Sequence, residues 1–276
     1  MWSTVDAMKF GFVVPWGDAD DVGDLAAAAE EAEWDGLFVW EPIWGVDAWI
    51  ALGLAAVRTS KIRLGTLLTP PSRRRPWELA SQVATVDRLS NGRVTLSVGL
   101  GAIDSGFETF GEECDRRIRA ELMDECLDVM CGLWNGQPFA YDGTHYQIEP
   151  TEFPTIGHVA QDGRVPIWCV AAAGHEKSLG RALRWDGVIP QILGDDGARL
   201  PDLDETAALR ARIDAEVIDR PFDIVIEGSI SDHSPAAYAD AGATWWIESM
   251  WDAIGQHSPV TAAYDRLVQG PPRPEE

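Results

Sequence analysis

The sequence predicts a (β/α)8 barrel, the fold also called the TIM barrel, with an insertion between its fourth and fifth strands. Short apolar runs alternate with stretches of helical period along the whole chain, and this alternation indicates a parallel sheet. Eight such units occur in 276 residues, and a β/α barrel typically takes about 250 residues. We therefore expect one barrel domain over residues 1–276.

A doubly wound open sheet is the main alternative, because it also alternates strands with helices. That fold usually carries a G-x-G-x-x-G turn after its first strand to bind a dinucleotide. The turn after the first apolar run, residues 12–17, lacks this motif. The closed barrel is therefore the favoured architecture.

The first half of the chain contains four strand–helix units. Pro76 suits the first position of a helix, where its missing N–H would have no partner anyway, and Asn91-Gly92 forms a turn before the fourth strand. The predicted strands are 9–14, 36–40, 62–68 and 94–98, and the predicted helices are 20–33, 47–58, 76–89 and 115–134.

The second half begins with the insertion. Residues 137–148 read as a short hairpin that turns at Asp142-Gly143, and residues 151–164 read as a long loop. Four more units follow. Their predicted strands are 166–171, 187–192, 222–226 and 243–247, and their predicted helices are 176–184, 204–217, 235–241 and 260–268.

Charge and cysteine content limit the class of protein. Lys and Arg number 22 against 45 Asp and Glu, which gives a net charge of −23. A field of this sign repels nucleic acid and anionic membrane surfaces, so neither is an expected partner. The four cysteines form no C-x-x-C pair, and no signal-peptide pattern or membrane-length apolar run is seen. We expect a soluble cytoplasmic protein with reduced thiols.

Two segments beyond strand ends could bind an anion, since chemistry in these barrels lies where strands end. Arg73-Arg74-Arg75 is the densest positive run, and it is either an anion site or a solvated loop paired with surface acids. Residues 171–174 are small and precede a helix with Lys177 in its first turn. They form either a phosphate cradle or a close helix–strand contact.

Large aromatic side chains also gather near the predicted strand ends. They could stack on a flat conjugated ligand, or fill the barrel mouth or a subunit interface. The chain has thirteen tryptophans, and those near strand ends are Trp16, Trp40, Trp44, Trp245, Trp246 and Trp251.

Three glutamates, Glu41, Glu227 and Glu248, follow or end predicted strands. Two of them could form an acid/base pair or, with a histidine, bind a metal. No histidine shows the H-x-H or H-E-x-x-H spacing, so no metal site is predicted. The histidines are His145, His158, His175, His233 and His257.

Several ordered segments resemble the bacterial luciferase-like monooxygenase family, and they cover nearly the whole chain. The most specific is D-R-L-S-N-G-R at 87–93. The others are I-R-L-G-T at 62–66, R-P-W-E-L-A at 75–80, G-L-G at 99–101, F-E-T-F-G at 107–111, L-W-N-G at 133–136, P-I-W at 166–168, R-W-D-G at 184–187 and A-G-A-T-W-W-I-E at 241–248.

The resemblance implies a β/α barrel with FMN or a deazaflavin coenzyme across the strand C-termini. In the family, the loop after strand five holds the cofactor phosphate, and the end of strand three lies against the ring system. A strained bulge is expected there, at Thr66. The cofactor-binding residues expected from the two anion segments and the resemblance are Thr66, Leu67, Arg73, Arg75, Ala172, Ala173, Gly174 and Lys177.

The resemblance also implies an oxidoreductase or monooxygenase that acts on a small organic substrate. A separate reductase and a homodimer are the expected partners. Many relatives end strand two with Trp-x-Asp/Glu-His, whereas this chain has Trp40-Glu41-Pro42 and lacks the histidine. Glu41 is then the first candidate for proton handling and Glu248 the second. The missing histidine leaves a cofactor-binding barrel without catalysis as one alternative. The strand-end carboxylates leave a carboxylate- or metal-dependent hydrolase as another.

Overall fold

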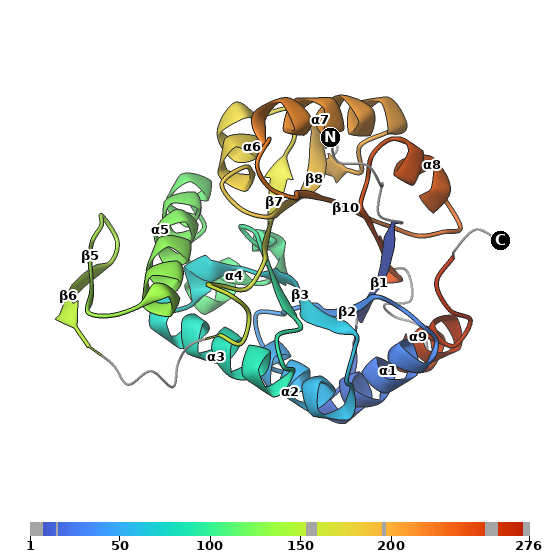
Figure 1. The fold of residues 1–276 in the computed structure, drawn as a ribbon, viewed down its shortest axis with the longest axis horizontal. Coiled ribbons are helices and arrows are strands. Elements are labelled where there is room, and N and C mark those ends of the chain that lie inside the picture. The colour runs from blue at the N-terminus through green and yellow to red at the C-terminus, as the bar shows by residue number, and fades with distance from the viewer. Residues whose placement is uncertain (1–7, 15, 153–158, 195–196, 252–258, 273–276) are drawn as a thin grey trace.

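Eight parallel strands close into a barrel in the computed structural model, which describes residues 8–14, 16–152, 159–194, 197–251 and 259–272 (Figure 1). Pairing of β8 with β10 closes the ring, and this closure excludes the open-sheet alternative. The barrel strands are β1 (Lys9–Val14), β2 (Gly36–Val39), β3 (Arg63–Thr69), β4 (Val94–Val98), β7 (Ile167–Ala172), β8 (Gly187–Gly194), β10 (Asp223–Gly228) and β11 (Trp245–Glu248).

Helices surround the barrel in the predicted order, and acidic N-caps fix the start of several. Asp18, Asp47 and Asp202 each accept hydrogen bonds from backbone N–H groups in the first helical turn, which satisfies donors that lack a helical partner. The barrel helices are α1 (Ala19–Glu31), α2 (Ala48–Arg58), α3 (Pro76–Leu89), α5 (Arg116–Asn135), α6 (Glu176–Ala182), α7 (Leu203–Glu216), α8 (Pro235–Asp240) and α9 (Pro259–Leu267). Among the described residues, no helix is long and apolar enough to cross a bilayer.

The predicted insertion between the fourth and fifth barrel strands is confirmed. The hairpin of β5 (Phe139–Asp142) and β6 (Gln147–Thr151) lies outside the ring beside α5 (Figure 1). The sequence did not reveal three short helical turns on βα loops. They are η1 (Pro71–Arg73), η2 (Ile103–Ser105) and α4 (Phe107–Phe110).

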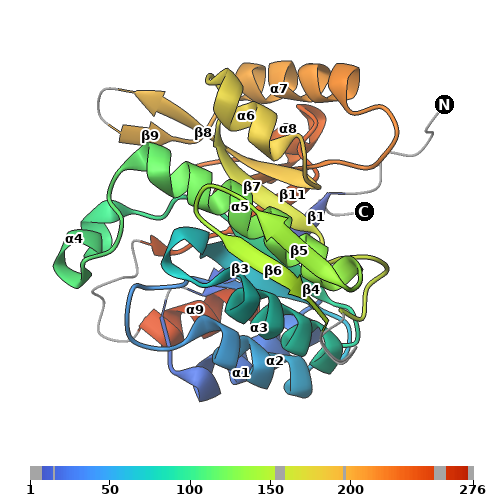
Figure 2. The same ribbon diagram turned by 90° about the vertical axis from the view of Figure 1, so that its left-hand side faces the viewer.

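A second antiparallel pair extends the strand β8 beyond the barrel. β8 continues two residues past its predicted end at 192 and pairs with β9 (Gly197–Arg199), which the sequence did not predict. The β8–β9 hairpin and α4 project from the same end of the barrel (Figure 2). These two elements therefore form walls around the mouth at the strand C-termini.

The opposite half of the barrel interior is filled with aromatic rings. Phe38, Trp168 and Trp245 contact one another at ring-centroid distances of 5.2–6.1 Å. Gly36 and Gly65 leave room for the Phe38 ring, because a Cβ on either would approach its atoms to 2.9–3.1 Å. Among the described residues, this half is therefore solid core, and the large cavity lies toward the strand C-termini.

Candidate functional site

A cavity of about 1260 Å³ occupies the C-terminal end of the barrel. Side chains alternate across each strand, so the residues two places beyond core residues point into this space. Trp40 follows Phe38, Gln191 follows Ile189, and Glu227 follows Val225, and all three line the cavity. Its volume exceeds the roughly 300–1,000 Å³ of common ligand pockets, which leaves room for two ligands side by side.

The cavity is positively charged although the chain is strongly acidic. Six Arg and Lys side chains line it against three Glu side chains, so it favours anionic ligands. The basic residues are Arg73, Arg116, Arg117, Arg119, Lys177 and Arg181, and the acidic ones are Glu41, Glu121 and Glu227.

Glu41 lies at the cavity edge, but its carboxylate is fully engaged. Arg73 Nη2 and Arg74 Nη2 lie 3.0 and 2.9 Å from Oε1, and the Thr69 hydroxyl donates to Oε2 at 2.7 Å. The Glu41 side chain is only 2% exposed. Of the two interpretations of the arginine run, an anion site or a loop paired with surface acids, the structure agrees with the second in that Arg73 and Arg74 pair with an acid. That acid, Glu41, is buried and not at the surface. The predicted cofactor ligand Arg75 instead lies over the Trp77 ring and does not line the cavity.

The expected irregularity at the end of β3 is confirmed. Pairing with β4 shifts register between Thr66 and Thr69, and the Leu67–Leu68 peptide bond within this stretch is cis. Leu67 and Leu68 line the cavity as an apolar floor. Thr66, predicted to bind cofactor, points away and bonds the Thr69 hydroxyl at 2.9 Å. Thr66 is therefore a support for the floor.

The turn between β7 and α6 contributes side chains to the cavity more than it contributes free backbone N–H groups. Ala172 N–H donates to Ser178 Oγ, Ala173 N–H to the Gln191 carbonyl, and His175 N–H to the Ala172 carbonyl. The predicted backbone cradle is therefore largely occupied by bonds within the protein. Ala172 and Lys177 line the cavity as expected, whereas Ala173 and Gly174 do not. Among the described residues, no carboxylate forms an ion pair with the Lys177 ammonium.

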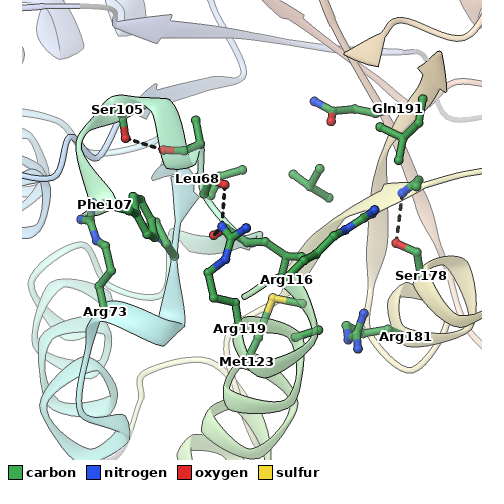
Figure 3. A pocket seen from close by; sticks show the side chains of 18 of the residues that line it. Leu68, Arg73, Ser105, Phe107, Arg116, Arg119, Met123, Ser178, Arg181 and Gln191 are labelled. Carbon is green, nitrogen blue, oxygen red and sulfur yellow. Dashed lines mark hydrogen bonds between the residues drawn. The ribbon is translucent and has the colours of Figure 1, made fainter. Parts of the chain in front are cut away.

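The start of α5 supplies cations to the cavity that were not predicted from the sequence. Arg116 extends toward the α6 side of the cavity, where Ser178 and Arg181 lie (Figure 3), and no described residue forms an ion pair with it. The available signal was the run Asp115-Arg116-Arg117-Ile118-Arg119, an N-cap followed by three arginines. Its distance in sequence from the other strand ends concealed its place in the site.

Arg119 is buried beside the mouth, with only 5% of its surface exposed. Its Nη1 donates to the Leu100 and Gly101 carbonyls at 2.6 and 3.0 Å. The Phe107 ring lies between the guanidinium groups of Arg73 and Arg119, at 5.6 and 5.5 Å from its centroid (Figure 3). Burial lowers the pKa of Arg119.

Glu227 and Glu248 end neighbouring strands but point in opposite directions. Glu227 pairs with Ile247, an interior residue, and faces the cavity. Burial raises the pKa of Glu227, and a hydrogen bond from Trp251 Nε1 partly opposes this rise. Glu248 points outward to Trp246 Nε1 at 3.0 Å and to Arg266, and it does not line the cavity. The prediction of Glu248 as a proton-handling residue is therefore not supported. Successive side chains of a strand point to opposite faces, and Glu248 is one residue beyond the inward-facing Ile247.

The six tryptophans near strand ends divide into two groups. Trp40 and Trp251 line the cavity and pack edge to face at 6.1 Å, and Trp16 continues this contact from outside at 5.5 Å. The remaining three do not reach the cavity: Trp245 fills the barrel core, Trp246 packs behind it, and Trp44 is 74% exposed.

Among the described residues, no group of three or more His, Cys, Asp or Glu side chains is arranged to hold a metal ion. His175 lines the cavity rim, and His145 contacts Glu121 at 3.1 Å. His158 and His257 lie outside the described residues.

Residues 8–271 match the model of the family described as luciferase-like monooxygenase. The chain belongs to this family. The sequence resemblance noted above is therefore confirmed, and the match extends across every barrel strand.

Relatives of this family member include proteins named for a deazaflavin coenzyme. An F420-dependent glucose-6-phosphate dehydrogenase of Nocardia farcinica is 34% identical over 167 residues, which are 55% of this chain and 47% of that protein. A putative coenzyme F420-dependent oxidoreductase of Mycobacterium tuberculosis is 30% identical over 154 residues, or 54% of this chain and 44% of that protein. The chain spans about half the length of these curated relatives.

Solved structures confirm the barrel. The coenzyme F420-dependent tetrahydromethanopterin reductase of Methanopyrus kandleri has a TM-score of 0.74 at 17% identity, and the alignment covers 96% of this chain and 98% of that chain. The similarity at this level of identity establishes the shared fold.

Proposed function

We propose that this luciferase-like chain is an oxidoreductase that binds a deazaflavin coenzyme, or in second place FMN, and acts on a small organic substrate. The observation that carries the proposal is a cationic cavity with an apolar floor at the strand C-termini of an acidic protein. Anionic cofactors of this kind combine a flat conjugated ring with a charged tail. The names of the curated relatives favour the deazaflavin over FMN.

The residues present fit such a cofactor in two parts. Leu67, Leu68 and Val170 form an apolar surface for a flat ring, and Gly99 keeps it open, because a Cβ there would lie 2.8 Å from Leu68 Cδ2. Arg116 and Lys177 supply cations for an anionic tail. When bound, the cofactor would supply the hydride or oxygen chemistry, which amino-acid side chains cannot carry out.

Glu227 is the residue that we assign to proton handling. It faces the cavity, and its raised pKa places proton transfer closer to neutral pH than an ordinary carboxyl allows. Trp251 holds this carboxyl through its indole N–H. Glu41, whose oxygens accept from two arginines and a threonine, instead positions the arginine loop.

A parallel titration with FMN, FAD and the deazaflavin coenzyme tests the proposal. Trp40 and Trp251 line the cavity, so quenching of tryptophan fluorescence should report binding. We expect one cofactor to saturate the signal. The double substitution Arg116→Ala/Lys177→Ala should weaken cofactor binding by roughly tenfold or more, as expected for lost charge-assisted hydrogen bonds.

Arg184→Met is the matched control, because it removes an arginine that pairs with Asp128 and does not line the cavity. It should bind cofactor as the unchanged protein does. Absence of saturable binding by all three cofactors contradicts the proposal. Binding without turnover across donors and acceptors would favour the non-catalytic cofactor-binding barrel.

A further inference from the structure

Two arginines that line one wall of the cavity, Arg73 and Arg119, differ in their partners. Arg73 and Arg74 both pair with Glu41, whereas Arg119 bonds only the carbonyls of Leu100 and Gly101 among the described residues. Glu41, Arg73 and Arg74 have side chains that are 2%, 8% and 18% exposed. Burial lowers the pKa of Arg119, and the charges of Glu113 and Asp115 only partly oppose this. A buried cation without an ion-pair partner is unfavourable, so a bound anion would stabilise this wall of the cavity.

The unused donors of this wall belong to cavity-lining side chains. Arg119 Nη2 has no acceptor among the described residues. Arg119 Nε also has none, but it is fully covered, so Nη2 is the donor left for a ligand. Arg73 uses its Nη2 for Glu41 and the Pro42 carbonyl, which leaves Nη1 without an acceptor in the described structure. The Phe107 ring, which lies between both guanidinium groups, holds them in place from within the wall (Figure 3).

We propose that Arg73, Arg119 and Phe107 form a substrate-anchoring wall that binds a carboxylate or phosphate group of the substrate. The substrate of the proposed oxidoreductase would then be an organic anion. The identification of the bound anion as a substrate rests on the proposed function. The anion site itself does not require a bound cofactor. Guanidinium groups suit this task because their donors match the oxygens of carboxylate and phosphate.

The wall differs from the cations assigned to the cofactor tail. Arg116 and Lys177 are exposed at the rim, whereas Arg73 and Arg119 are buried. Salt and water screen the buried pair less, so an anion at the wall is held more strongly for each contact. A bound anion would also oppose the effect of burial, which lowers the pKa of Arg119.

The test uses inorganic phosphate and acetate as probes, titrated by isothermal calorimetry. The starting protein is the double variant Arg116→Ala/Lys177→Ala, which lacks the two rim cations assigned to the cofactor tail. In this variant, anion binding in the described cavity reports on the wall. We expect saturable binding of at least one probe to this variant. Adding Arg119→Met should weaken that binding by roughly tenfold or more, whereas adding Arg184→Met should not change it.

The two probes distinguish the two kinds of oxyanion. Stronger phosphate binding identifies a phosphorylated substrate, and stronger acetate binding identifies a carboxylic acid. If Arg119→Met fails to fold, Arg119→Lys and Arg73→Lys replace it. Each keeps the charge but loses the planar donor set, and each should weaken binding severalfold.

Equal probe binding with and without Arg119, or no binding of either probe to the starting variant, overturns the inference. Failure of the proposed function looks different. In that case no cofactor quenches the tryptophan fluorescence of the unchanged protein, while the loss of probe binding on Arg119→Met persists.

Discussion

Asp223 and Glu227 lie on the same strand, four residues apart, and both point into the barrel, yet their surroundings differ. Asp223 is half-buried and accepts hydrogen bonds from Trp168 Nε1 at 3.0 Å and from the Thr244 hydroxyl at 2.9 Å. Glu227 faces the cavity and accepts only from Trp251 among the described residues. Burial raises the pKa of both carboxyls. The comparison shows that one strand supports a structural acid at its start and a chemically available acid at its end.

The largest expected effect concerns the closed half of the barrel. Trp168→Ala should reduce the free energy of unfolding by about 3–5 kcal/mol, because it removes a fully buried ring and leaves a cavity. Denaturant unfolding measures this loss. Trp40→Ala, at the open end, should cost clearly less. Equal losses at both positions would contradict the division of the barrel into a solid half and an open half.

The next effect concerns catalysis at the open end. Glu227→Gln should lower kcat/KM by about a hundredfold or more, since general acid–base groups contribute roughly that much. The matched change Asp223→Asn should leave kcat/KM unchanged. Steady-state kinetics with the first accepted substrate measures both. Full activity of Glu227→Gln would remove Glu227 from the proposed mechanism.

A smaller effect is the dependence of stability on pH. A raised carboxyl pKa means that the folded protein holds the proton more tightly than the unfolded chain. The resulting stabilisation is present at low pH and decreases as pH rises from about 4, the unfolded value, through the folded pKa. Asp223→Asn should therefore flatten the fall in unfolding free energy across this window. An unchanged slope in urea titrations from acid to neutral pH would argue against a raised pKa at Asp223.

The smallest expected effect concerns the floor of the cavity. Gly99→Ala places a Cβ 2.8 Å from Leu68 Cδ2 and 3.3 Å from Val170 Cβ. These side chains can shift by a few tenths of an ångström, so we expect the Kd of the cofactor to rise only severalfold. Fluorescence titration measures the change. Unaltered affinity would indicate that the flat ring does not lie on this floor.

Most of the fold was predictable because periodicity and caps are local properties of the sequence. The helix predicted at 76–89 and the strands predicted at 9–14 and 94–98 have the observed bounds, and most others differ by one or two residues. The strand β9 was missed because it pairs only with an extension of β8 beyond the barrel.

The site was less predictable because it depends on side-chain direction and on distant contacts. A single residue decides whether a strand-end side chain faces the cavity, which separates Leu67 from Thr66 and Glu227 from Glu248. Nothing local indicates that Glu41 pairs with arginines some thirty residues away. The expected reductase and homodimer stay predictions.

The contrast between a chain of charge −23 and its cationic cavity has a kinetic consequence. At low ionic strength, an approaching anion first meets the repulsion of the whole molecule. At about 0.15 M salt the Debye length is roughly 8 Å, so the distant acids are screened while the cavity cations still act at contact range. Moderate salt should therefore accelerate capture of an anionic ligand, the reverse of the behaviour of a basic protein, and the ligand would be selected by its ability to enter the cavity rather than by long-range steering.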